Sequence, residues 1–166
     1  MKILVSRCLI GGLCRYDGCS SADFSHTLET AGFSKTDIIP ICPENDGGLD
    51  TPRFPSEIQG GDGTDVLSGR AQVLMNCGKD CTRNFIDGAY VALRKAQQTG
   101  VKVALLKSKS PSCGLGQIYD GTFSGVLTTG DGVTTALLKK HDIHIISEKQ
   151  IATLFLYKED GNERDC

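Results

Sequence analysis

The sequence predicts a single three-layer α/β/α domain built on a mainly parallel β-sheet. Short apolar segments alternate with segments of helical periodicity along most of the chain, which is the pattern of repeated βαβ units. A length of 166 residues is that of one domain and can bury a full core without disulfides or structural metals. Each crossover between parallel strands is expected to be right-handed.

The strands and helices follow from apolar runs and from helix stop signals. Helix ends are marked by glycine at positions 32 and 100, and the segment 101–106 is the most strongly apolar strand. Residues 43–69 are rich in Gly, Pro and Asp and are expected to form a long functional loop. Strands are expected at 2–6, 37–41, 71–75, 101–106 and 143–146, and helices at 22–32, 80–99, 133–140 and 148–157. The domain therefore spans 1–157, and 158–166 is expected to be a charged, disordered tail.

Composition narrows the class of function. A net charge of −2 disfavours binding to a nucleic-acid polymer through phosphate neutralisation, although it allows binding of a single base or nucleoside. Neither a signal peptide nor a run of ~20 apolar residues is visible, so we expect a cytoplasmic protein without a membrane partner. In that compartment the eight cysteines are expected to serve in metal or cluster binding, in catalysis or in the core rather than in disulfides.

Three cysteines follow predicted strands. Cys8 and Cys42 come directly after the first two strands, and Cys113 lies in the loop after 101–106. The carboxyl ends of parallel strands share one edge of a sheet, where ligands of such folds bind. Turn-forming residues flank all three cysteines, which disfavours the alternative that they only fill the core. We therefore expect Cys8, Cys42 and Cys113 to form one metal-binding site.

Three thiolates and one vacant position are typical of a metal centre that performs chemistry. The spacing alone leaves open a zinc ion or an iron–sulfur cluster. Cys14 and Cys19 lie close enough along the chain to approach the same site. The pair Cys77 and Cys81 opens the long helix and has the spacing of a second, less favoured metal site.

Polar residues next to the three cysteines are the candidates for substrate binding and proton transfer. A carboxylate beside a metal-bound substrate is placed to move a proton, which favours Glu44, two residues after Cys42, as a general base. The expected catalytic residues are Glu44, Ser110 and Ser112. The expected substrate-binding residues are Arg15, Tyr16, Asp17 and Asp120.

Several segments together resemble a bacterial domain-of-unknown-function family that includes the [4Fe-4S]-dependent thiouracil desulfidases. The resemblance covers roughly residues 1–148, and its most specific parts are Cys-Pro-Glu, Ser-Pro-Ser-Cys-Gly and Tyr-Asp-Gly-Thr-Phe. The matching segments begin at Cys8 (Cys-Leu-Ile-Gly), Cys14 (Cys-Arg-Tyr-Asp-Gly), Cys42, Gly47 (Gly-Gly-Leu), Thr51 (Thr-Pro-Arg), Gly78 (Gly-Lys-Asp-Cys-Thr), Lys107, Ser110 and Tyr119.

The resemblance implies a [4Fe-4S] cluster on Cys8, Cys42 and Cys113, with one iron open to the sulfur of a 4-thiouracil-like base or nucleoside. It also implies non-redox release of that sulfur as hydrogen sulfide, with Glu44 activating water and Ser110 or Ser112 orienting the substrate or relaying a proton. Such a cluster is expected to be lost from protein handled in air. The residues alone also allow two alternatives: a non-catalytic sensor or carrier that binds a cluster or metal, and a zinc hydrolase.

Overall fold

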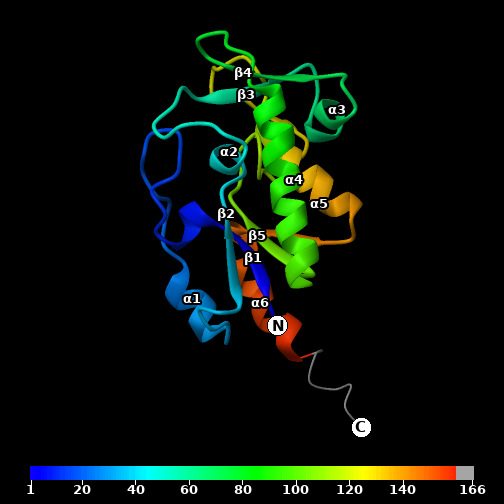
Figure 1. Ribbon diagram of the computed structural model, residues 1–166. Helices are drawn as coiled ribbons and strands as arrows, with labels where there is room; N and C mark the ends of the chain where they lie inside the picture. Colours follow the sequence, from blue (N-terminus) through cyan, green and yellow to red (C-terminus); the bar gives the residue numbers. More distant parts are fainter. Residues whose placement is uncertain (160–166) are drawn as a thin grey trace.

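A computed structural model describes residues 1–159 of the chain and shows a parallel sheet with helices on both faces (Figure 1). The four-stranded sheet has the order β2-β1-β5-β8. Its strands are β1 (Ile3–Ser6), β2 (Ile38–Ile41), β5 (Val103–Leu106) and β8 (His144–Ser147). Every adjacent pair is parallel. The chain leaves β1 toward one side and returns for β5 on the other, so the switch in strand order lies between β1 and β5.

Helices divide between the two faces of the sheet. The helices are α1 (Ser25–Thr30), α2 (Pro43–Asp46), α3 (Gly63–Leu67), α4 (Thr82–Thr99), α5 (Val133–Lys140) and α6 (Leu154–Glu159), together with the 3-10 helices η1 (Arg7–Ile10) and η2 (Glu148–Thr153). Helices α4 and α5 pack on one face, with α3 beside α5. Helix α1 and the start of α6 pack on the other. The expected three-layer α/β/α class is confirmed.

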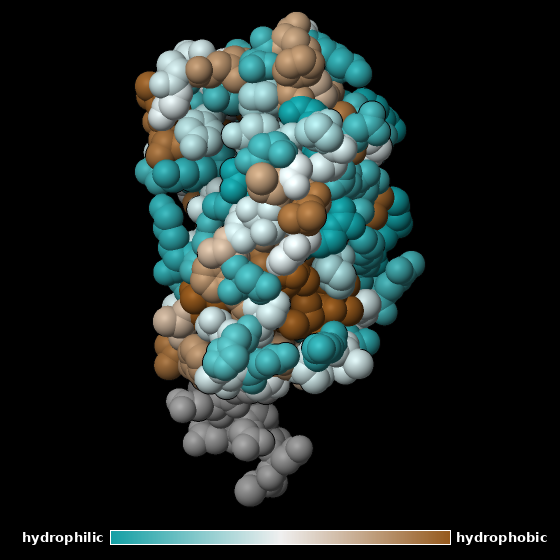
Figure 2. Space-filling view, turned by 90° about the vertical axis from the view of Figure 1, so that its left-hand side faces the viewer, coloured by the Kyte–Doolittle hydropathy of each residue, from teal (hydrophilic) through white to brown (hydrophobic). Residues whose placement is uncertain are grey.

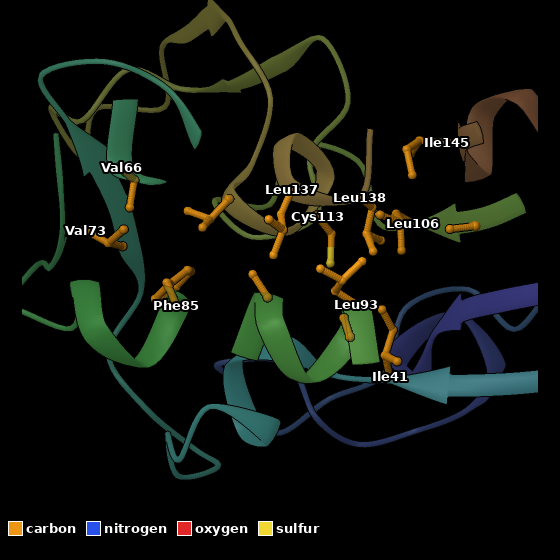
Figure 3. Packing of buried hydrophobic residues seen from close by; sticks show 14 of the residues in the cluster. Ile41, Val66, Val73, Phe85, Leu93, Leu106, Cys113, Leu137, Leu138 and Ile145 are labelled. Carbon is orange, nitrogen blue, oxygen red and sulfur yellow. The ribbon is translucent and has the colours of Figure 1, made fainter. Parts of the chain in front are cut away.

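Side chains of each central strand alternate between the two cores. Leu4 of β1 and Leu106 of β5 face α4 and α5, whereas Val5 and Leu105 face α1. Because both faces are covered, β1 and β5 are buried along their whole length, as expected for parallel strands. Figure 3 shows Cys113 within the first of these cores, close to side chains of α4 and α5.

Helix α2 lies directly against α4. A Cβ atom at Gly88 would be only 1.8 Å from the carbonyl oxygen of Pro43, so the two backbones meet at this glycine. Proline is favoured at the first position of a helix, which explains why α2 begins at Pro43. The contact fixes the segment that follows β2 and therefore the position of Cys42.

The expectation of a long loop over 43–69 was wrong, because this segment contains α2, α3 and β3 (Ser56–Gln59). Strand β3 pairs antiparallel with β4 (Gln72–Met75), so β4 lies outside the parallel sheet. A second antiparallel pair, β6 (Gln117–Tyr119) and β7 (Leu127–Thr129), was also missed. The elements that were not expected are α2, α3, β3, β6 and β7. Each spans only three to five residues, which is too few for a periodic pattern to identify. A capping box on Asp62 was the one local signal for α3.

The ends of two helices also differ from those expected from the sequence. Helix α1 begins only at Ser25, and the expected helix over 148–157 is divided into η2 and α6. Helix α6 extends to Glu159, and the rest of the expected charged tail, 160–166, lies outside the described residues.

The face in Figure 2 carries a mixed surface. Hydrophilic and hydrophobic residues are interspersed, with the hydrophobic ones most concentrated in the lower half of the view. Within residues 1–159, no helix is both long enough and apolar enough to cross a membrane.

Candidate active site

A pocket of about 400 Å³ opens at the carboxyl edge of the sheet, and four cysteines line it. Cys8 lies in η1 directly after β1, Cys42 is the N-cap residue of α2 directly after β2, and Cys113 lies in the turn after β5. The fourth is Cys14, in the irregular segment between η1 and α1. All four are buried free thiols. The structure thus brings Cys8, Cys42 and Cys113 to one site next to the switch in strand order.

Hydroxyl groups hold the turn that carries Cys113. Ser110 Oγ accepts hydrogen bonds from the backbone N–H groups of Ser112 and Cys113, each at 3.1 Å. The Ser112 hydroxyl is 2.8 Å from Oγ1 of Thr134, and Thr135 Oγ1 donates to the Cys113 carbonyl over 2.9 Å. Both serines line the pocket, and these contacts fix the turn against the start of α5.

Cys8 is held by Ser21. The Ser21 backbone N–H donates to the Cys8 carbonyl over 2.8 Å. The buried Ser21 hydroxyl interacts with the Cys8 thiol and lowers its pKa.

The thiols differ in their tendency to ionise. The hydrogen bond between Cys8 and Cys14 lowers the pKa of Cys8 despite its burial. The hydrogen bond between Cys42 and Cys14, together with burial, raises the pKa of Cys42. Burial raises the pKa of Cys113 to about 12. Because metals bind thiolates, loading this site with a metal group would release protons.

Glu44 lies in α2, two residues after Cys42, and lines the pocket. Its Oε2 atom accepts a hydrogen bond from Nε of Arg53 over 2.7 Å and also contacts Nη2 of that guanidinium. The two side chains are only 16% and 5% exposed. Nη2 of Arg53 also donates to the Cys14 carbonyl over 3.1 Å. Arg53 therefore orients Glu44 and ties it to the cysteine site.

A second charged network borders the pocket at Lys107. The Lys107 ammonium pairs with Glu148, whose other carboxylate oxygen accepts from the Ser108 N–H over 2.7 Å. Burial raises the pKa of Glu148, but the hydrogen bonds from Lys107 and Ser108 outweigh it and lower that pKa overall. Glu57 of β3 also lines the pocket, and its carboxylate accepts hydrogen bonds from the N–H groups of Gly121 and Phe123.

The expected substrate-binding residues divide into two groups. Arg15 and Tyr16 line the pocket mouth, with the guanidinium 5.9 Å from the Tyr16 ring centroid. Asp17 lies outside the lining and accepts from the Cys19 N–H while pairing with Arg15. Asp120 also lies outside and accepts from the N–H and hydroxyl of Thr122, which lower its pKa. Both aspartates thus bond within their own loops.

The remaining cysteines lie away from the pocket lining. Cys19 and Cys77 are exposed, and Cys81 is buried with its thiol 3.4 Å from the Val73 carbonyl. Cys166 lies outside the described residues. In the described part of the chain, no group of three or more Cys, His, Asp or Glu side chains has the geometry to hold a single metal ion.

Sequence reasoning missed Arg53, Glu57 and Lys107 as site residues. Arg53 and Lys107 stood in segments that carried the family resemblance, so that signal was available. Glu57 had no such signal, because β3 itself was not expected.

Comparison with known proteins identifies the family. The model of the 2-thiouracil desulfurase family matches residues 3–150. The chain belongs to the 2-thiouracil desulfurase family. The uncharacterized protein YbbK of Bacillus subtilis (strain 168) is 45% identical to this chain over 149 residues, which are 90% of this chain and 97% of YbbK. A solved structure of the [4Fe-4S]-dependent thiouracil desulfidase TudS matches with a TM-score of 0.84 and 43% identity, over 95% of this chain and 97% of that one.

Proposed function

We propose that this 2-thiouracil desulfurase family protein is a [4Fe-4S]-dependent enzyme that hydrolyses the carbon–sulfur bond of a thiolated pyrimidine such as 4-thiouracil. The products are the oxo base and hydrogen sulfide, without net oxidation or reduction. The observation that carries the proposal is the convergence of Cys8, Cys42 and Cys113 on the pocket that also contains Glu44. Family membership and the likeness to TudS support it.

The three cysteines Cys8, Cys42 and Cys113 are suitable ligands for an iron–sulfur cluster. Iron–sulfur clusters are held by cysteine thiolates, and these three buried free thiols come from three different strand ends around one cavity. The buried Ser21 hydroxyl hydrogen-bonds with the Cys8 thiol. Hydrogen bonds to sulfur are part of how proteins tune such clusters. When bound, the cluster would supply a Lewis-acidic iron that makes a thiocarbonyl carbon more electrophilic.

The chain itself would supply the proton transfer. Glu44 is held through Oε2 by the Arg53 guanidinium, and among the described residues no hydrogen bond is made to Oε1. We assign Oε1 the role of accepting a proton from the attacking water. A positioned general base typically contributes ~10²–10⁴-fold to the rate.

The walls of the pocket would bind the base and exclude water. Tyr16 at the mouth offers an aromatic face for a flat pyrimidine ring, and Arg15 beside it offers hydrogen-bond donors. Ser110 and Ser112 are assigned a positioning role, since their hydroxyls already bond the turn that carries Cys113.

An anaerobic assay tests the proposal. Protein reconstituted with iron and sulfide is incubated with 4-thiouracil, and uracil and free sulfide are quantified. We expect equal amounts of both, no turnover by Cys42→Ser, and undiminished turnover by Cys77→Ser, a matched exposed cysteine outside the pocket. Binding of thiolated pyrimidines without sulfide release would support the sensor or carrier alternative. Stoichiometric zinc without iron would support the hydrolase alternative.

A further inference from the structure

Glu57 is a pocket carboxylate to which the proposed reaction gives no role. It lies in β3, is only 8% exposed and lines the pocket. Its Oε2 atom accepts hydrogen bonds from the backbone N–H groups of Gly121 over 2.9 Å and of Phe123 over 3.0 Å. Within residues 1–159, no hydrogen bond is made to its Oε1 atom. One oxygen of Glu57 is therefore bound to the fold, and the other can accept a hydrogen bond from a ligand.

The charge of Glu57 also has no partner in the described part of the chain. Arg53 neutralises Glu44, and Lys107 neutralises Glu148 at the border of the same pocket. Glu57 forms no such ion pair with any residue that the structure describes. A carboxylate removed from water is costly unless hydrogen bonds satisfy it, and an ionised acceptor makes the stronger hydrogen bonds. The free oxygen of Glu57 is therefore a strong acceptor for a donor group on a molecule in the pocket.

Building on the proposed function, we propose that Glu57 determines specificity by accepting a hydrogen bond from the N3–H group of the thiolated pyrimidine. In 4-thiouracil, N3 is bonded to the ring carbon that carries the sulfur. N3–H is also the one ring N–H group that a free base shares with its N1-linked nucleoside. A site built to bond an N–H group rejects an analogue that lacks it, because the buried acceptor is then left unpaired.

The loop that Glu57 holds has further anchors. The side-chain amide of Gln59 donates to the Gly121 carbonyl. A Cβ atom at Gly121 would lie 2.6 Å from the carbonyl oxygen of Ile58, so the loop backbone packs directly on β3. Gly125 of the same loop lines the pocket. A change confined to the free oxygen of Glu57 should therefore leave this wall of the pocket in place.

Glutamine at position 57 separates the two roles of the side chain. Only its carbonyl oxygen can accept from the two loop N–H groups, so its NH2 group takes the place of the free Oε1 atom. The acceptor in the pocket then becomes a donor, which opposes the N3–H group. A purely structural role of Glu57 predicts no change in the choice of substrate, whereas the specificity role predicts one.

The test compares wild type, Glu57→Gln and the exposed control Glu29→Gln, all loaded anaerobically with iron and sulfide. The kcat/KM for sulfide release is measured on 4-thiouracil, on 3-methyl-4-thiouracil, which lacks N3–H, and on 1-methyl-4-thiouracil, which carries the same methyl group on the other ring nitrogen. Calorimetry with uracil, 3-methyluracil and 1-methyluracil measures binding without turnover. Iron analysis and urea titration check loading and folding.

We expect wild-type kcat/KM to be about 10- to 100-fold lower on the 3-methyl than on the 1-methyl substrate, the scale of one hydrogen bond to a charged group. Wild type should bind uracil more tightly than 3-methyluracil by a similar factor. Glu57→Gln should lose a comparable factor on 4-thiouracil and should process the two methylated substrates at similar rates. Its iron content and urea midpoint should stay near those of wild type, and Glu29→Gln should match wild type throughout.

Wild-type protein that processes and binds the two methylated bases equally well would overturn this inference, and that result needs no variant. A Glu57→Gln protein that keeps the wild-type preference would overturn it too. Both results leave the proposed function standing, because sulfide is still released. Wild-type protein that releases no sulfide from any of these bases would instead refute the proposed function, and its relative affinity for uracil and 3-methyluracil would still decide the role of Glu57.

Discussion

The guanidinium of Arg53 donates from Nε to Oε2 of Glu44 over 2.7 Å, and both side chains are largely removed from solvent. Arginine suits this position because its planar fork can bond several acceptors at once. Here it also bonds the carbonyl oxygens of Cys14 and Asp50. The proposed base and the loop of the fourth cysteine therefore share one positively charged anchor.

Replacing Glu44 with glutamine should remove the base and leave the cluster. We expect sulfide release to fall ~10²–10⁴-fold, the usual contribution of general-base catalysis. Iron content should stay at the wild-type level, since Glu44 is not a thiolate donor. The assay is turnover of 4-thiouracil beside iron analysis, with the exposed Glu29→Gln as the control. Wild-type turnover by Glu44→Gln would mean that Glu44 is not the base.

Removing the Arg53 charge should destabilise the folded protein and also lower its activity. Breaking a buried ion pair by removing one partner costs about 3–5 kcal/mol, because the other charge is left uncompensated. Arg53→Met should therefore lower the free energy of unfolding by about that amount, measured by urea titration of the cluster-free protein. Arg94→Met, at an exposed site on α4, is the control. A change in Arg53→Met no larger than in Arg94→Met would contradict the structural role.

Glu148 should make stability depend on pH in the acidic range. Its pKa is lowered in the folded protein by Lys107 and Ser108, which outweigh burial. A lowered pKa means that the stabilisation is present above the unfolded value of about 4.3 and is lost as the pH falls through the folded value. Glu148→Gln should cost about 1–3 kcal/mol at pH 7. The difference from wild type should shrink below about pH 4. Urea titrations from pH 7 to pH 3 measure it, and a difference that is constant with pH would refute the assignment.

A methyl group at Gly88 should disrupt the contact between α2 and α4. The added Cβ would lie 1.8 Å from the Pro43 carbonyl oxygen, and backbone atoms can yield only by moving α2. Overpacking of this kind costs about 1–3 kcal/mol or more. Since Cys42 is the N-cap residue of α2, Gly88→Ala should also reduce the iron retained per chain. Calorimetry and iron analysis check this against Gln97→Ala at an exposed position of the same helix. A Gly88→Ala variant with an unchanged melting temperature would show that α2 adapts freely.

The sequence predicted best those site residues that lie close to the ends of β-strands. Cys8 and Cys42 lie within two residues of the ends of strands β1 and β2, so the parallel arrangement was enough to bring them to one edge. Arg53 was not predicted as a site residue, because its distance from Glu44 depends on the path of the loop between α2 and β3 rather than on any periodic pattern. Asp17 and Asp120 were expected at the substrate, but each has hydrogen-bond donors two residues along its own chain. Such local bonding of aspartate in turns competes with a role in the pocket.

The most direct test of the central claim is the origin of the oxygen in the product. The reconstituted protein is supplied anaerobically with 4-thiouracil in ¹⁸O-water, without an electron donor or acceptor. The account predicts that every uracil formed carries one ¹⁸O atom and that one sulfide is released with it. Uracil without the label, or cluster-loaded protein that releases no sulfide, would contradict hydrolytic desulfuration at this site.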